Sequence, residues 1–275
     1  VTALNWAQPT AANGFQLAIT PAGRLLTALP EPITVSAAGP ATLTLQGAGF
    51  IPGMRVEVRD AGGAALGIFT PTLVTGNTLQ VTLDVTGIPA QMATLALVWP
   101  DEQALSLEGA VIIVTTGIGP RLETSIDVPA AMRPNRRYTV WFHYANTGDA
   151  DLAAPLFTVT SDDAVMRLRP DAPWQEGRLQ FLGLNSEAPV EVLPPGCRRS
   201  IPIYIETRGT VGQRIEFEYV QLEYNTGAVD WRAYSHLLRP ADVSAADWSA
   251  TWPQVEAYLG ATWDGYFNAL YDEAA

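Results

Sequence analysis

Hydrophobic and polar positions alternate along residues 134–152, between a Pro-Asn turn and an Asn-Thr-Gly-Asp turn. One parity of this segment holds Tyr138, Val140, Phe142 and Tyr144. A two-residue period bounded by turn residues predicts a half-buried β-strand with these side chains toward the core. Trp141 and His143 have the opposite parity, so we expect them on the outer side of the sheet.

The first 115 residues repeat this pattern in shorter segments. Strands are predicted around Leu43, around Val56 and at 78–85, 93–99 and 110–114, with Gly- and Pro-containing turns between them. Short strands at this spacing without a helical segment indicate a small antiparallel sandwich, which we place at residues 33–116. Residues 1–32 alternate only weakly and are predicted to be a linker or a leading strand.

A glycine-rich motif lies inside this predicted sandwich. Residues 43–58, LTLQGAGFIPGMRVEV, resemble the opening of TIG (IPT) immunoglobulin-like domains, and the resemblance extends over about 33–115. It implies a structural or binding module of a multi-domain extracellular protein. A few TIG domains bind DNA, which a chain of net charge −12 would do poorly.

A second module is predicted at residues 121–226, after a Gly- and Pro-containing joint that puts the boundary at 115–121. Its aromatic strand, its Asn-Thr-Gly-Asp turn and the segment VLPPGCRRSIPIYIET resemble the CARDB-like adhesion modules of bacterial secreted proteins. The resemblance implies an adhesive sandwich. Residues 171–189 depart from the compact pattern and look like an insertion.

The periodicity changes to three- and four-residue steps near the end of the chain. Residues 240–275 are predicted to form an amphipathic helical tail with the apolar positions Trp248, Trp252, Val255, Leu259, Trp263, Phe267 and Leu270. Ser244 is the expected N-cap, and Pro253, Gly260 and Gly265 are expected to split the tail into two shorter helices. The tail is predicted to pack on the second sandwich, over Trp141, or on a neighbouring module.

Composition narrows the possible partners. Hydrophobic residues make up 48% of the chain and charged residues 16%, which suits a folded β-rich protein. The net charge of −12 argues against nucleic acid and anionic membranes, and no apolar run is long enough for membrane insertion. No signal peptide is visible, and the first residue is valine, so we expect an excised or processed piece of a longer protein.

Catalysis is not expected from the motifs. The sequence has no nucleophile elbow, no metalloprotease or dinucleotide motif and no paired Cys-x-x-Cys. A Ser-His-Asp triad can be drawn on paper from His143 or His236, but no local motif supports one. All 16 basic residues are arginine, which excludes lysine chemistry, and Cys197 is interpreted as a plain turn residue.

Two kinds of candidate site remain. Asp149 and Asp151, with Asp162 and Asp163, lie across a candidate hairpin, so their carboxylates could converge on calcium. Asp is also favoured in turns for its own backbone hydrogen bonds, and no cofactor is the preferred expectation. The candidate aromatic residues for a carbohydrate ligand are Trp141, Trp174 and Tyr204, each expected more often to be covered by the chain.

The resulting prediction is a mainly β protein: two immunoglobulin-like antiparallel β-sandwiches in tandem with a C-terminal helical tail. The favoured function is a non-catalytic structural or adhesive segment of a large modular extracellular or cell-surface bacterial protein. Its expected partners are neighbouring modules, and an extracellular protein or glycan. The alternative is a carbohydrate-binding or other ligand-binding module, and a weaker one is an accessory region that positions a downstream enzyme or toxin domain.

Overall fold

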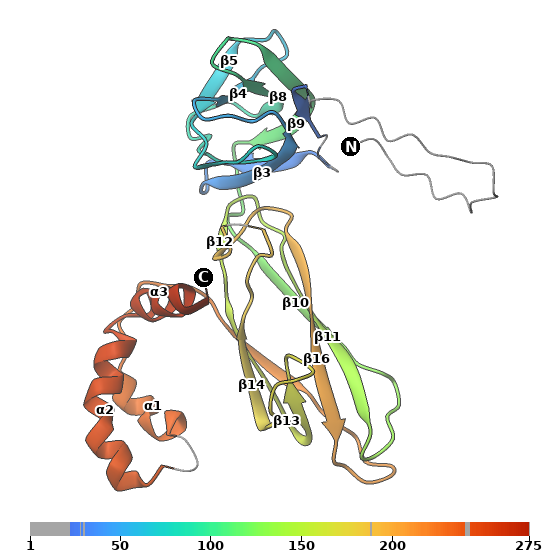
Figure 1. The fold of residues 1–275 in the computed structure, drawn as a ribbon, viewed down its shortest axis with the longest axis vertical. Coiled ribbons are helices and arrows are strands. Elements are labelled where there is room, and N and C mark those ends of the chain that lie inside the picture. The colour runs from blue at the N-terminus through green and yellow to red at the C-terminus, as the bar shows by residue number, and fades with distance from the viewer. Residues whose placement is uncertain (1–22, 28, 30, 188, 240–242, 275) are drawn as a thin grey trace, which may run out of the picture. The chain divides into compact units, whose positions relative to one another are not determined.

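The chain is mainly β, with antiparallel pairing and three helices at its end among the described residues (Figure 1). The computed structural model describes residues 23–27, 29, 31–187, 189–239 and 243–274. Most of the predicted linker at 1–32 lies outside the described residues. None of the helices in the described part is long and apolar enough to cross a lipid bilayer.

Two sheets form the first sandwich. One sheet has the order β1-β3-β7-β6, formed by β1 (Leu25–Leu26), β3 (Ala41–Ala48), β7 (Thr78–Leu83) and β6 (Leu73–Val74). The other has the order β2-β9-β8-β4-β5, formed by β2 (Ile33–Ser36), β9 (Ala104–Val114), β8 (Gln91–Val98), β4 (Arg55–Arg59) and β5 (Ala65–Phe69). Alternating residues such as Leu45, Val56 and Leu95 are fully buried, as the two-residue period predicts.

The Gly-Ala-Gly-Phe motif closes one end of this sandwich. The indole Nε1 of Trp99 donates a hydrogen bond to the carbonyl oxygen of Gly49 at 2.8 Å, and the Trp99 ring lies 6.4 Å from that of Phe50. Gly49 has a φ of 73°, a conformation that glycine adopts at little cost. The motif therefore lies against a buried tryptophan where the chain passes from β3 in one sheet to β4 in the other.

A second group of strands is built around long antiparallel pairs. The main order is β10-β11-β16-β13-β14, formed by β10 (Leu122–Asp127), β11 (Arg137–Asn146), β16 (Arg198–Thr207), β13 (Leu156–Arg167) and β14 (Gln175–Leu182). β17 (Glu218–Leu222) also pairs with β13, and β12 (Leu152–Ala153) pairs with β15 (Val192–Leu193). Leu122 lies opposite Asn146, and Leu222 lies opposite Leu156.

β13 changes partners along its length. Residues 156–160 pair with β17, whereas residues 164–167 pair with β16. The register with β14 shifts between Ser161 and Val165, so the strand carries a bulge there. The bulge lets one strand serve both halves of the sandwich, whose core includes Phe142, Phe157 and Ile203 at 0% exposure.

Residues 171–189 are not an insertion, contrary to the sequence-based interpretation. They contain β14, which pairs with β13 from Leu156 to Met166. Leu179 and Phe181 of this strand are 1% and 7% exposed and belong to the core. The glycine and charged residues of β14 hid its alternation.

The C-terminal segment forms three helices, α1 (Trp231–Leu238), α2 (Ala245–Leu259) and α3 (Trp263–Ala274). The predicted cap is confirmed, because the Ser244 side chain accepts a hydrogen bond from the amide of Asp247. The predicted division is confirmed at Gly260, but it was wrong for Pro253 and Gly265, which lie inside α2 and α3. α1 was not predicted; it places Trp231, 5% exposed, against Trp263 and Tyr266.

The tail contacts the second sandwich through α3, as predicted, but it does not cover Trp141. The Tyr271 hydroxyl donates to the carbonyl oxygen of Ala154 at 2.6 Å, and Phe267 is fully buried beside Tyr224. Trp141 remains 45% exposed. The expectation that the Trp-rich stripe lies over this tryptophan was wrong, because α1 and α3 supply its aromatic partners.

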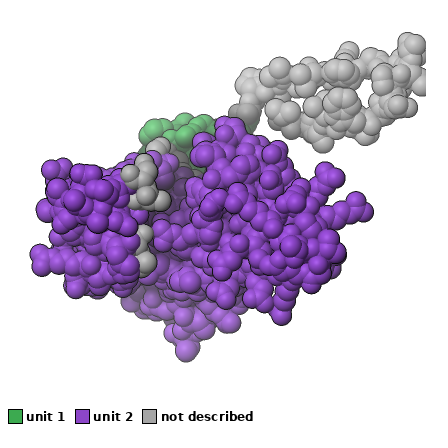
Figure 2. Space-filling model, turned by 90° about the horizontal axis from the view of Figure 1, so that it is seen from below, with its two compact units in different colours: residues 1–32, 43–82, 91–112 green, residues 33–42, 83–90, 113–275 purple. Residues whose placement is uncertain are grey.

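The chain divides into two compact units (Figure 2). The first holds the described residues before 33 together with 43–82 and 91–112, and the second holds 33–42, 83–90 and 113–275. These limits differ from the predicted modules 33–116 and 121–226, since residues 33–42 and 83–90 group with the later strands. Which pieces fold alone stays a prediction.

Candidate functional site

The two faces of β11 differ as its alternation predicts. Val140 and Phe142 are fully buried, and Tyr144 is 3% exposed with its hydroxyl donating to the carbonyl oxygen of Leu184. Burial raises the pKa of Tyr144 to about 12. Trp141 and His143 point away from this core, so they lie where a ligand can reach them.

The strand register places outward side chains of β10, β11 and β16 in three rows. The rows are Asp127–Trp141–Pro202, Ser125–His143–Ser200 and Glu123–Ala145–Arg198. We call these nine side chains the outer face. All three strands are regular and paired along these rows, so the backbone fixes the spacing of the side chains.

His143 joins the three strands of its row by hydrogen bonds. Its Nδ1 lies 2.7 Å from the Ser200 Oγ, and its Nε2 lies 3.1 Å from the Asp127 Oδ2. Serine hydrolases have the reverse arrangement, with the serine on Nε2 and the aspartate on Nδ1. Ser200 also lies in a regular strand rather than a strained turn. The row therefore orders the outer face and gives no argument for catalysis.

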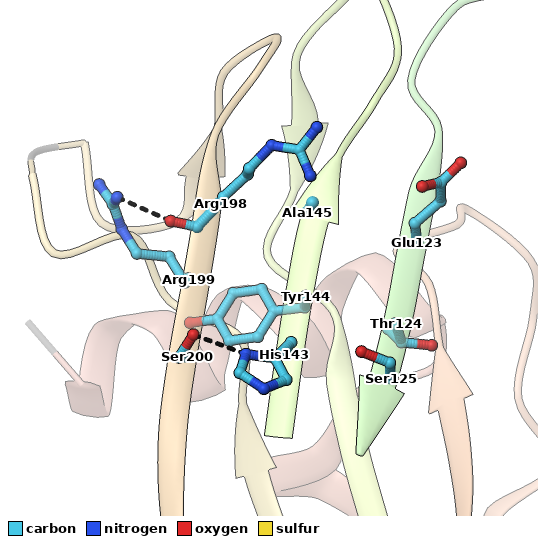
Figure 3. Close-up of a pocket in the computed structure, with 9 residues that line it drawn as sticks. All are labelled: Glu123, Thr124, Ser125, His143, Tyr144, Ala145, Arg198, Arg199 and Ser200. Atoms are coloured by element: carbon cyan, nitrogen blue, oxygen red, sulfur yellow. Dashed lines mark hydrogen bonds between the residues drawn. The ribbon is translucent and has the colours of Figure 1, made fainter. Parts of the chain in front are cut away.

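A hollow of about 410 Å³ lies at one end of the outer face (Figure 3). It is lined by Glu123, Thr124, Ser125, His143, Tyr144, Ala145, Arg198, Arg199 and Ser200. The short side chain of Ala145 stands between the longer ones of Glu123 and Arg198, which leaves space above the strand. Arg198 reaches from β16 toward Ala145, and Glu123 rises from β10 on the other side (Figure 3).

Charges around the hollow are unequally balanced. Glu123 forms an ion pair with Arg121 at 3.3 Å. Arg198 is exposed, and among the described residues its guanidinium has no hydrogen-bond or ion-pair partner. The hollow thus presents one uncompensated positive charge.

The three aromatic candidates are only partly brought together. Tyr204 lies opposite Thr139 in β16, so it shares the side of the sheet that carries Trp141. Trp174 lies before β14, and its ring stacks on the guanidinium of Arg167 at 4.1 Å, with that of Arg137 at 5.5 Å. Of the three candidates, Trp141 is therefore the one with a large exposed surface, whereas the ring of Trp174 already stacks against two arginine side chains.

The four acidic candidates lie at two separate places. Asp149 accepts hydrogen bonds from the amides of Ile118 and Gly119, and Asp151 accepts them from the amide and hydroxyl of Thr42. Asp162 and Asp163 occupy the bulge of β13, where Asp163 accepts from Gln213. The structure does not bring the two pairs together, and no cluster of three or more metal-ligating side chains occurs within the described ranges.

Several outer-face residues had no signal of their own in the sequence. Asp127, Ser125, Ser200 and Arg198 are ordinary residues of alternating strands, and only the register of β10 and β16 against β11 brings them together. Register depends on long-range pairing, so local periodicity does not report it. Parity alone identified Trp141 and His143.

Comparison with known proteins gives little beyond the fold. No protein family and no curated protein matches the chain. Similar solved structures include DIP-gamma IG1+IG2, 12% identical over 73% of this chain and 96% of that chain, with a TM-score of 0.23. A Salmonella alpha-2-macroglobulin is 13% identical over 75% of this chain and 15% of that one, also at 0.23. A chimeric titin Z1Z2 is 14% identical over 74% and 98%, at 0.24.

Superpositions this weak carry no argument about activity. The β-sandwich architecture rests on the strand pairing and buried cores described above. The resemblances to TIG and CARDB-like modules rest on the residues quoted for them and remain predictions.

Proposed function

We propose that this chain is a non-catalytic adhesive segment of a larger modular extracellular protein. The observation that supports the proposal is the outer face, where Trp141 is 45% exposed on β11, a strand paired with β10 on one side and β16 on the other. A large aromatic side chain held on rigid strands is the usual centre of a recognition surface. The face binds its partner through fixed side chains, and no reacting group is required.

A direct test uses the intact chain immobilised on beads and challenged with bacterial and animal cell surfaces. Trp141→Ala should abolish retention, because it removes the exposed aromatic centre without touching the core. The matched control is Tyr258→Ala, since Tyr258 is 61% exposed but belongs to α2. Equal retention of the wild-type chain and Trp141→Ala would refute the role of this face.

Carbohydrate is the second candidate ligand. Trp141 and Tyr204 lie on one side of the sheet beside hydroxyl and carboxylate groups, a combination that suits sugar rings and their hydroxyls. A glycan array probed with the intact chain tests this. Binding to defined glycans that Trp141→Ala loses would support the assignment. Binding only to proteins would show that the outer face recognises a protein and not a carbohydrate.

A further inference from the structure

We infer that the hollow beside Ala145 recognises an acidic sugar residue, carboxylated or sulfated, of a glycan in which another ring, further along the chain, stacks on Trp141. The inference rests on the carbohydrate-binding function proposed above and adds the chemical class of the ligand. It comes from the shape of the hollow, from the charge of Arg198 and from the distance between the two subsites.

The shape of the hollow follows from three neighbouring residues. Ala145 is the short central member of the row Glu123–Ala145–Arg198, so its two neighbours form walls on either side. Adjacent strands are about 4.8 Å apart, so the backbones of β10 and β16 lie about 10 Å from each other, and the Arg198 side chain reaches into the space between them (Figure 3). A single sugar residue with a charged substituent fits between them.

The charge of the hollow favours an anion. The nearby carboxylates already have cationic or hydrogen-bonding partners, since Glu123 pairs with Arg121 and Asp127 contacts His143. Arg198 has none within the described part of the chain. A guanidinium binds a carboxylate or a sulfate through two parallel hydrogen bonds, which is stronger and more selective than its contacts with hydroxyl groups.

The distance between the subsites sets the minimum length of the ligand. Trp141 and Ala145 are four residues apart on β11, or about 13 Å along the strand. Between them, Ser125 and Ser200 offer hydroxyl groups, and the bond to His143 holds the Ser200 hydroxyl in place. The ligand therefore spans more than one sugar residue, with a neutral ring on Trp141 and the acidic residue at Arg198.

An acidic peptide fits this face less well. Peptides commonly bind sheets by adding a strand to a free edge, where backbone groups are unpaired. β11 lies between β10 and β16 and is hydrogen-bonded on both sides. Above β11 the outer face therefore offers side chains alone, which suits the hydroxyl and acid groups of a glycan. On the end strand β10, the carbonyl oxygen of Thr124 already accepts a hydrogen bond from the Tyr219 hydroxyl at 3.3 Å.

The test measures binding of the intact chain to matched oligosaccharides by calorimetry. The probes are an oligogalacturonate and its methyl ester, and a sulfated chondroitin oligosaccharide and its desulfated form. We expect tighter binding of the charged member of at least one pair. Arg198→Gln should weaken that interaction about ten- to hundred-fold and leave the neutral member unchanged. Added salt should weaken only the charged complex.

Two controls keep the test specific. Arg133→Gln removes an exposed arginine outside the outer face and should change nothing, while Trp141→Ala should weaken charged and neutral probes alike. If Arg198→Gln binds the charged probes as tightly as the wild-type chain, acid recognition is overturned and the carbohydrate function stands. Binding of none of the four probes, or preference for an immobilised acidic peptide, would overturn the glycan assignment itself.

Discussion

Asp149 is a turn residue with an unusually buried role. Asp149 is only 5% exposed, and its carboxylate accepts hydrogen bonds from the backbone amides of Ile118 at 2.9 Å and Gly119 at 2.8 Å. Asp149→Ala leaves these amides without their acceptor, and we expect a loss of about 2–4 kcal/mol in the free energy of unfolding. Urea denaturation measures it.

Asp162 supplies the matched control for this substitution. In contrast to the buried Asp149, Asp162 is exposed to solvent in the bulge of β13. Asp162→Ala should change the unfolding free energy by no more than about 0.5 kcal/mol. Equal effects of the two substitutions would show that the hydrogen bonds of Asp149 add nothing.

Asp151 gives a pH-dependent prediction. Burial raises its pKa above the ordinary 3.8, although the hydrogen bonds from Thr42 act in the opposite direction. Between 3.8 and the raised value the folded chain keeps a proton that the unfolded chain has lost, so this group makes stability fall as pH rises through that window. Asp151→Asn should therefore be at least as stable as the wild-type chain at pH 7.

The measurement compares melting temperatures of the two chains across acidic and neutral pH. The advantage of Asp151→Asn should shrink as pH falls below the window, where both states of the wild-type carboxyl are protonated. An advantage that grows toward acid would contradict the raised pKa.

At the scale of elements, the strength of the hydrophobic period decided what the sequence could predict. β11 alternates over its whole length, and its two faces were assigned correctly. β5 is five residues long with a glycine at its centre, and β6 has only two residues, so neither shows a two-residue period and neither was predicted. The outer face was predicted only as far as Trp141 and His143, because its other members depend on register between distant strands.

Phe267 is the most deeply buried side chain of the three helices among the described residues. This residue is 0% exposed between Tyr224 and Tyr271, and truncating a buried phenylalanine costs about 3–5 kcal/mol. Phe267→Ala should release α3, so that Trp231 loses Trp263 and its emission moves to the red. Fluorescence spectra of the wild-type chain and of the exposed-site control Asn268→Ala provide the comparison. Unchanged emission in Phe267→Ala would refute this anchoring role.

At the scale of the whole chain, the predicted module boundary at 115–121 can be tested by measuring whether fragments that begin near it fold. The core of the second sandwich lies within residues 122–217, so a fragment of residues 121–275 should fold. It should melt below the intact chain, because it lacks Thr42 and the amides of Ile118 and Gly119. A fragment of residues 113–275 restores the two amides and should recover part of the loss. Identical melting of both fragments and the intact chain would contradict this account.

Removing metal ions should leave the stability unchanged. The carboxylates of Asp149 and Asp151 are already engaged by protein donors, and Asp162 and Asp163 lie elsewhere. We expect the same melting temperature in EDTA and in millimolar calcium, measured by circular dichroism. A rise of several degrees with calcium would show that these side chains rearrange into a cation site.

The antiparallel register of the second sandwich has a mechanical consequence. Its first strand, β10, begins opposite Asn146, where β11 ends, and its last strand, β17, ends opposite Leu156, where β13 begins. The chain therefore enters and leaves this sandwich at the same end. Antiparallel hydrogen bonds lie perpendicular to the strands. A force pulling these two points apart loads the bonds one after another, as in a zipper, instead of all at once. We therefore expect this sandwich to unfold at low tension when it is pulled from these two points, which force spectroscopy of the chain can measure.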